Sequence, residues 1–299
     1  MNIALVGASG QLGTDLQKVI PTDYLTLLNY PDFDITNRPG IQKLLARDKF
    51  EIVINTAAYN LVDRAEDYEQ EAYAVNFEGT QNLVDACKDQ GITLVHFSTD
   101  YVFGGDKNRN TPYTEENKPE PINKYGESKL AGERAVQENL KRYFIIRTSG
   151  LFGTAGSQGK GGNFIESIIK KSQGSPSGCK ACVVPAVSQL PIVDDQILTP
   201  TYTLDLAKQT WQLIQASHYG LYHATSHGEC SWYQFAQEVF KSLNKEVQLI
   251  PVKTKEYDLP ADRPRYCVLE NSRLQKLGLD IMRPWQETIP DYLKEKSYI

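Results

Sequence analysis

The chain is poor in sulfur and has no long apolar run. Its 299 residues include five cysteines and two methionines. Disulfide frameworks belong mainly to short secreted chains, so an odd cysteine count in a chain of this length leads us to expect reduced thiols and a cytoplasmic protein. The first residues, MNIALVGASG, are apolar for only about five positions, whereas a membrane helix needs about 20. We therefore expect neither a signal peptide nor a membrane span.

Clustered positive charge and a second cysteine pair are missing as well. The formal net charge is -5, and because nucleic acids are bound mainly through phosphate contacts to Lys and Arg, we expect no nucleic-acid partner. Cys179 and Cys182 form a C-x-x-C, but a zinc site needs about four ligands and no second pair follows. A surface-loop coincidence is favoured over zinc or redox function. The sequence names no metal ligand and leaves a requirement for Mg²⁺ open.

Short apolar runs alternate with stretches of helical periodicity. Runs typical of doubly buried strands cover Ile3–Val6, Leu25–Leu28, 52–56, 94–97, 144–148 and 221–224. Helices are predicted over 70–89, ending at Gly91, and over Thr203–Ala216 and 232–243. This order predicts an α/β fold, a Rossmann-type doubly wound parallel sheet with a smaller C-terminal α/β substrate lobe. We place the dinucleotide-binding domain at 1–150 and a mainly substrate-binding lobe at 151–299, with some segments returning to the sheet.

A glycine-rich turn follows the first predicted strand and opens a helix. It has the form G-x-x-G-x-x-G, with Gln11 and Leu12 between Gly10 and Gly13, and Gly7 at its start. Glycines let backbone N–H groups approach a pyrophosphate, and the helix N-terminus adds partial positive charge. The motif thus indicates a dinucleotide, with a ligand-free turn as the alternative.

Two further segments are candidates for the cofactor site. No carboxylate directly after the second strand could bind the ribose 2′-hydroxyl of NADH, and no Arg there could bind the 2′-phosphate of NADPH. The sequence therefore does not distinguish between the two cofactors. Asp34 and Ile35 are expected to line the adenine, or Asp34 to cap the next helix. The third strand is followed by Ala57, Ala58 and Tyr59. The small residues here would allow the backbone to pass close to a ribose or nicotinamide; the alternative is that they only allow tight packing in the sheet.

The predicted chemistry centres on three side chains. Tyr125 and Lys129 are four positions apart, which places them on one face of a helix, and Thr99 ends the fourth strand. A nearby ammonium is expected to lower the pKa of the tyrosine, which would then act as an acid at a carbonyl beside the Thr99 hydroxyl. N-capping of a following turn is the alternative for Thr99 and for Asp100.

With these motifs in place, the chain resembles the dTDP-4-dehydrorhamnose reductase family of extended short-chain dehydrogenases over nearly its whole length. The resemblance is carried by VGASGQLG, INTAAYNLVDRAE, AYAVNFEGT, HFSTDYVFGG, INKYGESKLAGE, IIRTSGLFG, GGNF, DQILTPT, GLYHAT, SWYQFA and ADRPRYCVLENSRLQKLGL. It implies that Thr99, Tyr125 and Lys129 are catalytic. NADPH or NADH would deliver hydride to C4 of a nucleotide-linked 4-keto-6-deoxyhexose while Tyr125 supplies the proton.

The same resemblance implies further contacts. Asn76 and Ser98 would join the cofactor site, and the sugar nucleotide would meet Asp100, Tyr101, Asn163, Gln196 and Arg263. Two positions depart from the family pattern: Gly150 stands where an aromatic is usual, and Leu198 where a glycine is usual. An insertion over 174–191 precedes Leu198. These departures bear on the identity of the sugar more than on the reaction.

Other functions share these motifs. A sugar-nucleotide 4,6-dehydratase would need a carboxylate where Tyr101 stands, and a 4-epimerase would retain its cofactor through the cycle. Related chains also serve as regulatory, non-catalytic subunits of methionine adenosyltransferase, although the intact Thr99, Tyr125 and Lys129 favour an enzyme. A homodimer is compatible with the sequence, which does not fix the oligomeric state.

Overall fold

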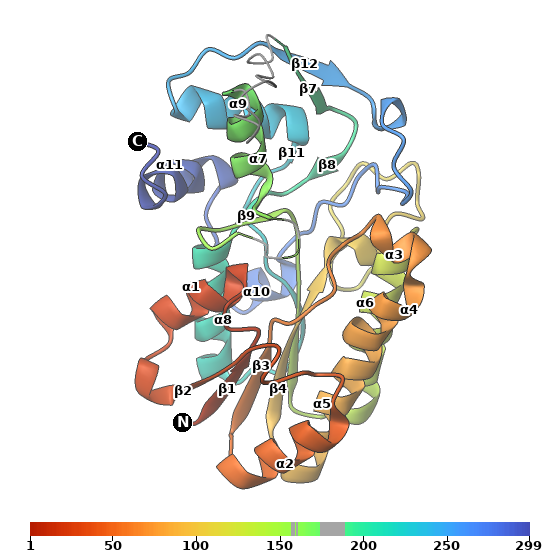
Figure 1. Ribbon diagram of the computed structural model, residues 1–299, viewed down its shortest axis with the longest axis vertical. Helices are drawn as coiled ribbons and strands as arrows, with labels where there is room; N and C mark the ends of the chain where they lie inside the picture. The colour runs from red at the N-terminus through yellow and green to blue at the C-terminus, as the bar shows by residue number, and fades with distance from the viewer. Residues whose placement is uncertain (157–158, 160, 174–188) are drawn as a thin grey trace, which may run out of the picture.

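The central layer of the protein is a parallel sheet of six strands (Figure 1). The computed structural model describes residues 1–156, 159, 161–173 and 189–299. Its sheet has the order β10-β5-β4-β3-β1-β2. The strands are β1 (Ile3–Val6), β2 (Leu25–Leu28), β3 (Ile52–Asn55), β4 (Thr93–Thr99), β5 (Tyr143–Thr148) and β10 (Gly220–His223). All six predicted runs are strands, and the predicted α/β class with a parallel sheet is confirmed.

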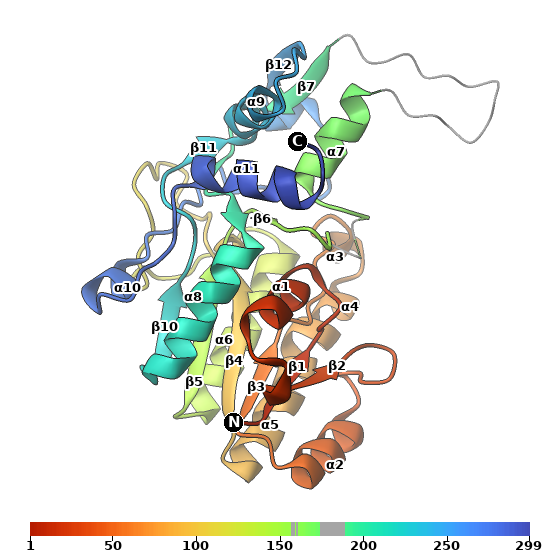
Figure 2. The ribbon, with the colours of Figure 1, turned by 90° about the vertical axis from the view of Figure 1, so that its left-hand side faces the viewer.

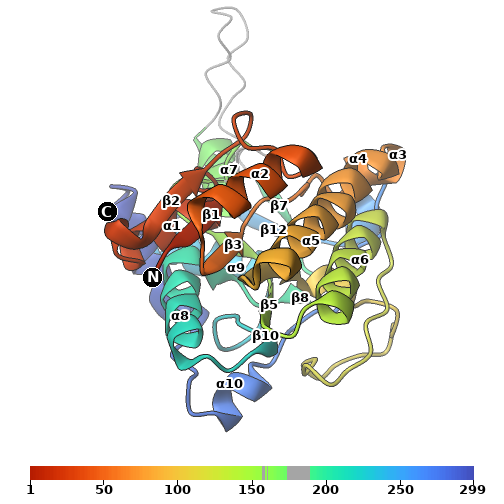
Figure 3. The same cartoon turned by 90° about the horizontal axis from the view of Figure 1, so that it is seen from below.

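Helices cover both faces of this sheet, as Figure 3 shows from below. One face carries α1 (Gln11–Val19) and α8 (Thr203–Ala216), and the other carries α2 (Arg38–Asp48), α5 (Thr80–Gln90) and α6 (Lys124–Asn139). Successive strand residues alternate between the two cores: Ile3 and Leu5 pack toward α1 and α8, whereas Ala4 and Val6 pack toward α2 and α5. Burial on both faces is why these strands read as continuous apolar runs.

The helix predicted over residues 70–89 is interrupted, which corrects that prediction. It consists of α4 (Glu69–Tyr73), a π-helical segment (Ala74–Gly79) and α5, and it ends at Gly91 with φ of +67° as expected. The wider turn brings the Asn76 carbonyl against α6, where a β-carbon on Gly132 would lie 2.4 Å from it. Apolar periodicity does not reveal such a turn, because the helix continues in the same direction on either side.

A smaller lobe lies above the carboxyl ends of the strands (Figure 2). It contains α7 (Phe164–Ser172), α9 (Trp232–Ser242), α11 (Trp285–Glu295) and three strand pairs. The pairs are β6 (Leu151–Phe152) with β9 (Thr201–Tyr202), β7 (Leu190–Val193) with β12 (Leu249–Val252), and β8 (Ile197–Leu198) with β11 (Cys230–Ser231). The lobe has its own core around Phe152, Phe235 and Tyr292.

Two short helices, α3 (Arg64–Asp67) and α10 (Ser272–Lys276), complete the α-helices of the described residues, which also form 3-10 helices at Thr22–Tyr24, Asp100–Val102 and Thr254–Glu256. Because β10 and α8 follow residue 150 yet belong to the large sheet and its cover, the chain passes back and forth between the lobes. A domain boundary at residue 150 stays a prediction. In the described part of the chain, no helix is both long and apolar enough to cross a membrane.

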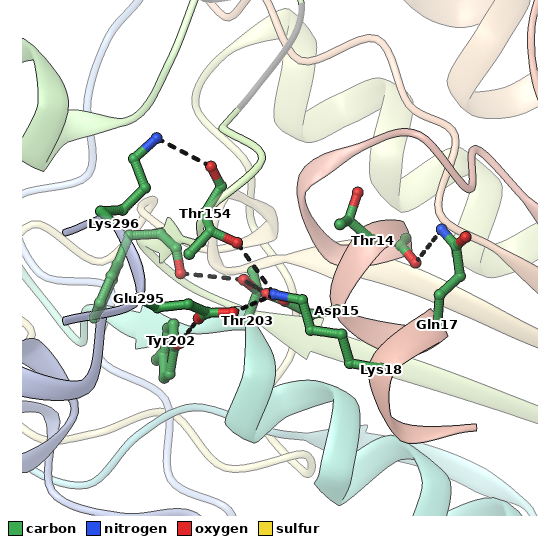
Figure 4. Close-up of polar contacts among 12 residues, drawn as sticks. Thr14, Asp15, Gln17, Lys18, Thr154, Tyr202, Thr203, Glu295 and Lys296 are labelled. Atoms are coloured by element: carbon green, nitrogen blue, oxygen red, sulfur yellow. Dashed lines mark hydrogen bonds and ion pairs between the residues drawn. The ribbon is translucent and has the colours of Figure 1, made fainter. Parts of the chain in front are cut away.

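A polar cluster joins the two lobes beside α1 (Figure 4). The buried carboxylate of Asp15 accepts hydrogen bonds from the Thr203 hydroxyl and, at 2.6 Å, from Lys18. Lys18 also reaches Glu295 at the end of α11, and Glu295 accepts a hydrogen bond from the Tyr202 hydroxyl. The helix that follows the glycine turn is therefore tied directly to the smaller lobe.

Candidate active site

A cavity of about 1090 Å³ opens where the strand order of the large sheet reverses. The chain leaves β1 for β2 on one side and then crosses to β3 on the other, and ligands of open α/β sheets bind beyond the strands at such a point. Most of the residues predicted from sequence line this cavity. They are Gly7, Gly10, Gln11, Leu12, Asp34, Ile35, Ala57, Ala58, Ser98, Thr99, Asp100, Tyr101, Tyr125, Lys129, Asn163 and Gln196. The remaining four, Gly13, Tyr59, Asn76 and Arg263, are not among the lining residues.

Two positions of the glycine turn, Gly7 and Gly13, have no room for a side chain. Gly7 has φ of +74°, a conformation that costs little only for glycine, and a β-carbon there would lie 2.8 Å from the Thr56 hydroxyl. A β-carbon on Gly13 would lie 2.4 Å from the Gly7 carbonyl oxygen, so Gly13 lets α1 pack on the turn instead of lining the cavity. Gly10 is the N-cap of α1 and provides no capping side chain. The helix N-terminus thus faces the cavity with its positive end.

Three buried polar atoms face this region without a hydrogen-bond partner in the described part of the chain. They are the Ser98 and Thr148 hydroxyl oxygens and the Gln11 amide oxygen. Ser98 and Thr148 lie on the neighbouring strands β4 and β5, and all three residues line the cavity. Because buried polar atoms are normally satisfied, these atoms fit a ligand with several hydrogen-bonding groups, such as the ribose and amide parts of a dinucleotide.

Asp34 lines the cavity but is not the N-cap of the next helix, which corrects the alternative interpretation of this residue. The residue lines the cavity, and its Oδ1 also accepts hydrogen bonds from the Thr36 N–H and hydroxyl, both at 2.8 Å. The N-cap of α2 is Asn37, so Asp34 caps only the turn that precedes that helix. Sequence reasoning missed Asn29, whose amide oxygen accepts a hydrogen bond from Ser9 N–H at 2.7 Å and so fixes the glycine turn to the end of β2.

Asn76 positions a neighbouring segment of the cavity wall. Its amide group makes two hydrogen bonds with the Tyr59 backbone, both 3.0 Å long, and donates a third to the Ser128 hydroxyl at 2.9 Å. The segment that carries Ala57 and Ala58 is thereby fastened to α6. Asn76 thus holds this segment in place, and the expected cofactor contacts of Asn76 and Tyr59 stay a prediction.

The start of α6 brings Tyr125 to the end of β4. Asn123 caps the helix by accepting a hydrogen bond from Gly126 N–H at 2.8 Å. A β-carbon on Gly126 would lie 2.2 Å from the Tyr101 carbonyl oxygen, so glycine allows this close approach. The Tyr101 and Tyr125 rings meet edge to face with 5.7 Å between centroids, and Tyr125 and Thr99 line the same cavity. Residues 99 and 125 therefore form one polar site.

The pKa values of this site correct the expectation that Lys129 lowers that of the tyrosine. Burial raises the pKa of Tyr125 to about 12, although the Thr99 side chain opposes the shift. Burial also lowers the pKa of Lys129 to about 8, with Glu133 acting in the opposite direction. The Lys129 ammonium donates to the Phe97 carbonyl oxygen at 2.7 Å. Near neutral pH, Tyr125 thus holds its proton and Lys129 is mostly charged, the states required of a proton donor and its supporting cation.

Asp100 is buried next to this pair and is met by three hydroxyl or thiol donors. Thr99 donates to its Oδ1 at 3.0 Å, and Ser149 and Cys267 donate to its Oδ2 at 2.7 and 2.9 Å. Burial raises the pKa of Asp100, and the three hydrogen bonds oppose that shift. Neither Ser149 nor Cys267 was predicted from sequence. Cys267 lies 167 positions from Asp100 and is brought there only by the fold.

The residues expected to hold the sugar nucleotide are largely engaged with the protein. Asn163 is the N-cap of α7 and donates to the Gly153 carbonyl at 3.0 Å, although it also lines the cavity. Gln196 lines the cavity and donates to the Thr254 hydroxyl at 2.9 Å. Nη2 of Arg263 donates to both carboxylate oxygens of Asp63, at 2.7 and 2.8 Å. In this structure Arg263 therefore joins the start of α3 to the 260s segment, and the expected diphosphate contact stays a prediction.

The two departures from the family pattern lie in contact with each other. Gly150 has φ of +54°, and a β-carbon there would stand 2.9 Å from Cδ1 of Leu198 and 3.1 Å from Cα of Pro200. Both Gly150 and Leu198 line the cavity. Leu198 therefore occupies the space that a side chain at position 150 would need. Cys179, Cys182 and most of the insertion lie outside the described residues.

Among the described residues, no group of three or more His, Cys, Asp and Glu side chains is arranged to hold a metal ion. The sequence leaves a requirement for Mg²⁺ open, and activity assays with and without the ion test it.

Comparison with known proteins agrees with the geometry. The family model described as the RmlD substrate binding domain matches residues 1–298. The chain belongs to the RmlD substrate binding domain family. A dTDP-4-keto-6-deoxy-D-glucose reductase from Streptomyces niveus is 34% identical over 285 residues, covering 94% of this chain and 92% of the relative.

Solved structures of the family superpose on nearly the whole chain. A dTDP-4-dehydrorhamnose reductase from Clostridium acetobutylicum has a TM-score of 0.89 and 35% identity, covering 99% of this chain and 100% of that one. A dTDP-4-dehydrorhamnose reductase from Bacillus anthracis, in complex with NADP, has a TM-score of 0.87 and 36% identity with the same coverage. The predicted family and its Rossmann-type fold are thus confirmed.

Proposed function

We propose that this RmlD-family protein reduces the C4 ketone of a nucleotide-linked 4-keto-6-deoxyhexose, with dTDP-4-dehydro-L-rhamnose as substrate and dTDP-L-rhamnose as product. NADPH or NADH, when bound along the glycine turn, supplies the hydride. The observation that carries the proposal is the position of Thr99, Tyr125 and Lys129 in the same cavity as the N-terminus of α1. A ketone and a dinucleotide can then meet in one cavity.

Tyr125 is the proton donor in this proposal. Its pKa of about 12 keeps the phenol protonated at neutral pH, so that the proton is available when an alkoxide forms. The Lys129 ammonium, held by the Phe97 carbonyl, supplies positive charge on the same helical face. The Thr99 hydroxyl lines the same cavity and lies ready to hydrogen-bond the ketone oxygen beside Tyr125. The glycine turn, Ser98 and Thr148 would hold the cofactor by backbone and hydroxyl contacts.

The identity of the sugar is the part of the proposal that most needs a test. The relatives include proteins named as reductases of dTDP-4-dehydrorhamnose and of dTDP-4-keto-6-deoxy-D-glucose at similar identity. At this part of the cavity wall, Gly150 after β5 has no side chain, and Leu198 of β8 supplies an apolar one instead. This exchange changes the shape of the site and leaves its catalytic groups untouched.

The test is to follow oxidation of NADPH and NADH by the purified protein with both of these sugar nucleotides. We expect turnover with dTDP-4-dehydro-L-rhamnose, and an unchanged cofactor Kd but a kcat lowered by about 10²- to 10⁴-fold in Tyr125→Phe. Parallel assays with EDTA or Mg²⁺, and the mass of the protein in solution, test the metal requirement and a homodimer. Cofactor binding without turnover of either sugar would refute the proposal and support a regulatory, non-catalytic role. Stoichiometric NAD that survives purification would support an epimerase.

A further inference from the structure

Helix α7 has one apolar face and one polar face. Its isoleucines are buried in the core of the smaller lobe, namely Ile165, Ile168 and Ile169. Four polar residues from its N-cap onward line the cavity instead, namely Asn163, Glu166, Ser167 and Lys170. Intervals of three and four residues place these side chains on one face of the helix. The polar face of α7 therefore forms part of the cavity wall.

The end of α11 holds this helix in its orientation. Asn163 donates to the Tyr292 hydroxyl at 2.9 Å, and Glu166 forms an ion pair of 2.6 Å with Lys296. Glu166 also lies four positions before Lys170, where a glutamate commonly pairs with a lysine of the same helix. In the described part of the chain, however, Glu166 pairs with Lys296, and no ion pair includes Lys170. The Lys170 ammonium is therefore not neutralised by its own helix.

Of the described residues in the cavity wall, Lys170 is the cation that remains available to a ligand. Lys129 is the other lysine among these lining residues, and it is buried and donates to the Phe97 carbonyl oxygen. Arg263 is not a lining residue and forms an ion pair with Asp63. Lys170, in contrast, is exposed at the wall of the cavity. An anionic group in the cavity can reach this ammonium without breaking an ion pair.

Aromatic rings from the smaller lobe line the same cavity. Phe164 is the first residue of α7 and Trp232 is the first residue of α9, and their ring centroids are 4.6 Å apart. A nucleotide combines a planar base, which stacks on aromatic side chains, with phosphates, which pair with lysine. The glycine turn of the large lobe is suited to the pyrophosphate of a dinucleotide. The wall formed by the smaller lobe is therefore suited to a second nucleotide.

We propose that Lys170 binds a phosphate group of a nucleotide in this cavity, and that the rings of Phe164 and Trp232 favour the diphosphate of the sugar nucleotide as its source. The inference rests on the proposed function for the identity of that nucleotide and on the cavity wall for the phosphate contact. Ser167, one turn earlier on α7, adds a hydroxyl donor to the same wall. Because this contact is remote from proton transfer at Tyr125, its loss should raise KM and leave kcat nearly unchanged.

The experiment measures the binding of dTDP, NADPH and NADH by calorimetry, together with KM for the sugar nucleotide. Lys170→Gln removes the charge, and we expect the Kd of dTDP and the KM to rise roughly three- to tenfold. Lys170→Arg keeps the charge and should bind dTDP nearly as wild type does. Lys171→Gln is the matched control, because Lys171 is the next residue of α7, is also exposed and is not a lining residue. The effect of Lys170→Gln should shrink at high salt, because salt screens exposed charges.

The three ligands distinguish the two sources of phosphate. A rise in Kd confined to dTDP assigns the contact to the sugar nucleotide. A rise confined to the cofactors assigns it to the dinucleotide, and to its 2′-phosphate if NADPH alone is affected. An unchanged Kd for all three ligands in Lys170→Gln would overturn the inference, as would an equal loss in Lys171→Gln. A protein that binds dTDP through Lys170 yet reduces neither sugar would keep the inference and refute the proposed function.

Discussion

Replacing Glu133 by glutamine should lower both the free energy of unfolding and the pH at which activity is lost on the alkaline side. Glu133 and Arg147 form a bidentate pair, with distances of 2.8 and 2.6 Å and side chains only 0% and 3% exposed. The pair joins α6, the helix of Tyr125 and Lys129, to β5. Removing the charge of Glu133 leaves a buried guanidinium without its counterion. Because breaking a buried pair costs about 3 to 5 kcal/mol, and glutamine keeps one acceptor, we expect a loss of about 3 kcal/mol.

The same substitution should act on Lys129, four residues earlier on the helix. Burial lowers the pKa of Lys129 to about 8, and Glu133 opposes this shift. Without the carboxylate, the ammonium is less favoured, and the pKa should fall by roughly one unit. The proposed mechanism needs charged Lys129, so activity is lost as the pH rises through its pKa. The alkaline limb of kcat should therefore move to lower pH in Glu133→Gln.

Two assays and a double variant check this reasoning. Urea unfolding gives the free energy of unfolding, and the pH dependence of kcat gives the alkaline limb. The variant Glu133→Gln with Arg147→Met removes both charges and should regain most of the stability, while its alkaline limb stays below that of wild type. An unchanged limb in Glu133→Gln would refute the electrostatic role of Glu133. A limb that returns to wild type together with stability would show that the effect was structural.

Three further predictions concern the cofactor turn, the joint between the lobes and the 260s segment. Gly13→Ala should weaken NADPH binding about tenfold, because its β-carbon would press on the Gly7 carbonyl; an unchanged Kd in a fluorescence titration would contradict this. Asp15→Ala removes the acceptor that joins α1 to the start of α8 and that holds Lys18, and it should cost about 2 kcal/mol in urea unfolding, whereas an unchanged midpoint would show the cluster in Figure 4 to be dispensable. Arg263→Ala should raise KM with little change in kcat, and Asp63→Ala should do the same if the pair acts as a unit; steady-state kinetics with an equal fall in kcat would contradict both.

The glycine spacing, the apolar runs and the Tyr125 to Lys129 interval were sufficient to predict the parallel sheet, the turn at α1 and the polar groups at the end of β4. These features depend on residues near one another in the sequence, where strand period, helical period and φ preference act directly. The helical period of the apolar residues is also a local property, and it predicted the first and last residues of α8 and α9 to within one position.

The tertiary structure alone determined the environment of those residues. Burial, which raises the pKa of Tyr125 and lowers that of Lys129, depends on which elements cover them, and no spacing contains that information. Asp63 forms an ion pair with Arg263, Leu198 fills the space beside Gly150, and the Cys267 thiol donates a hydrogen bond to Asp100. Each of these contacts joins segments that are far apart in the chain. The sequence thus determined which chemical groups are present at the sheet edge, whereas the packing of segments distant in the chain determined their charges and partners. The physical reason is that dielectric environment and hydrogen-bond partners are properties of the folded surroundings, not of the residue.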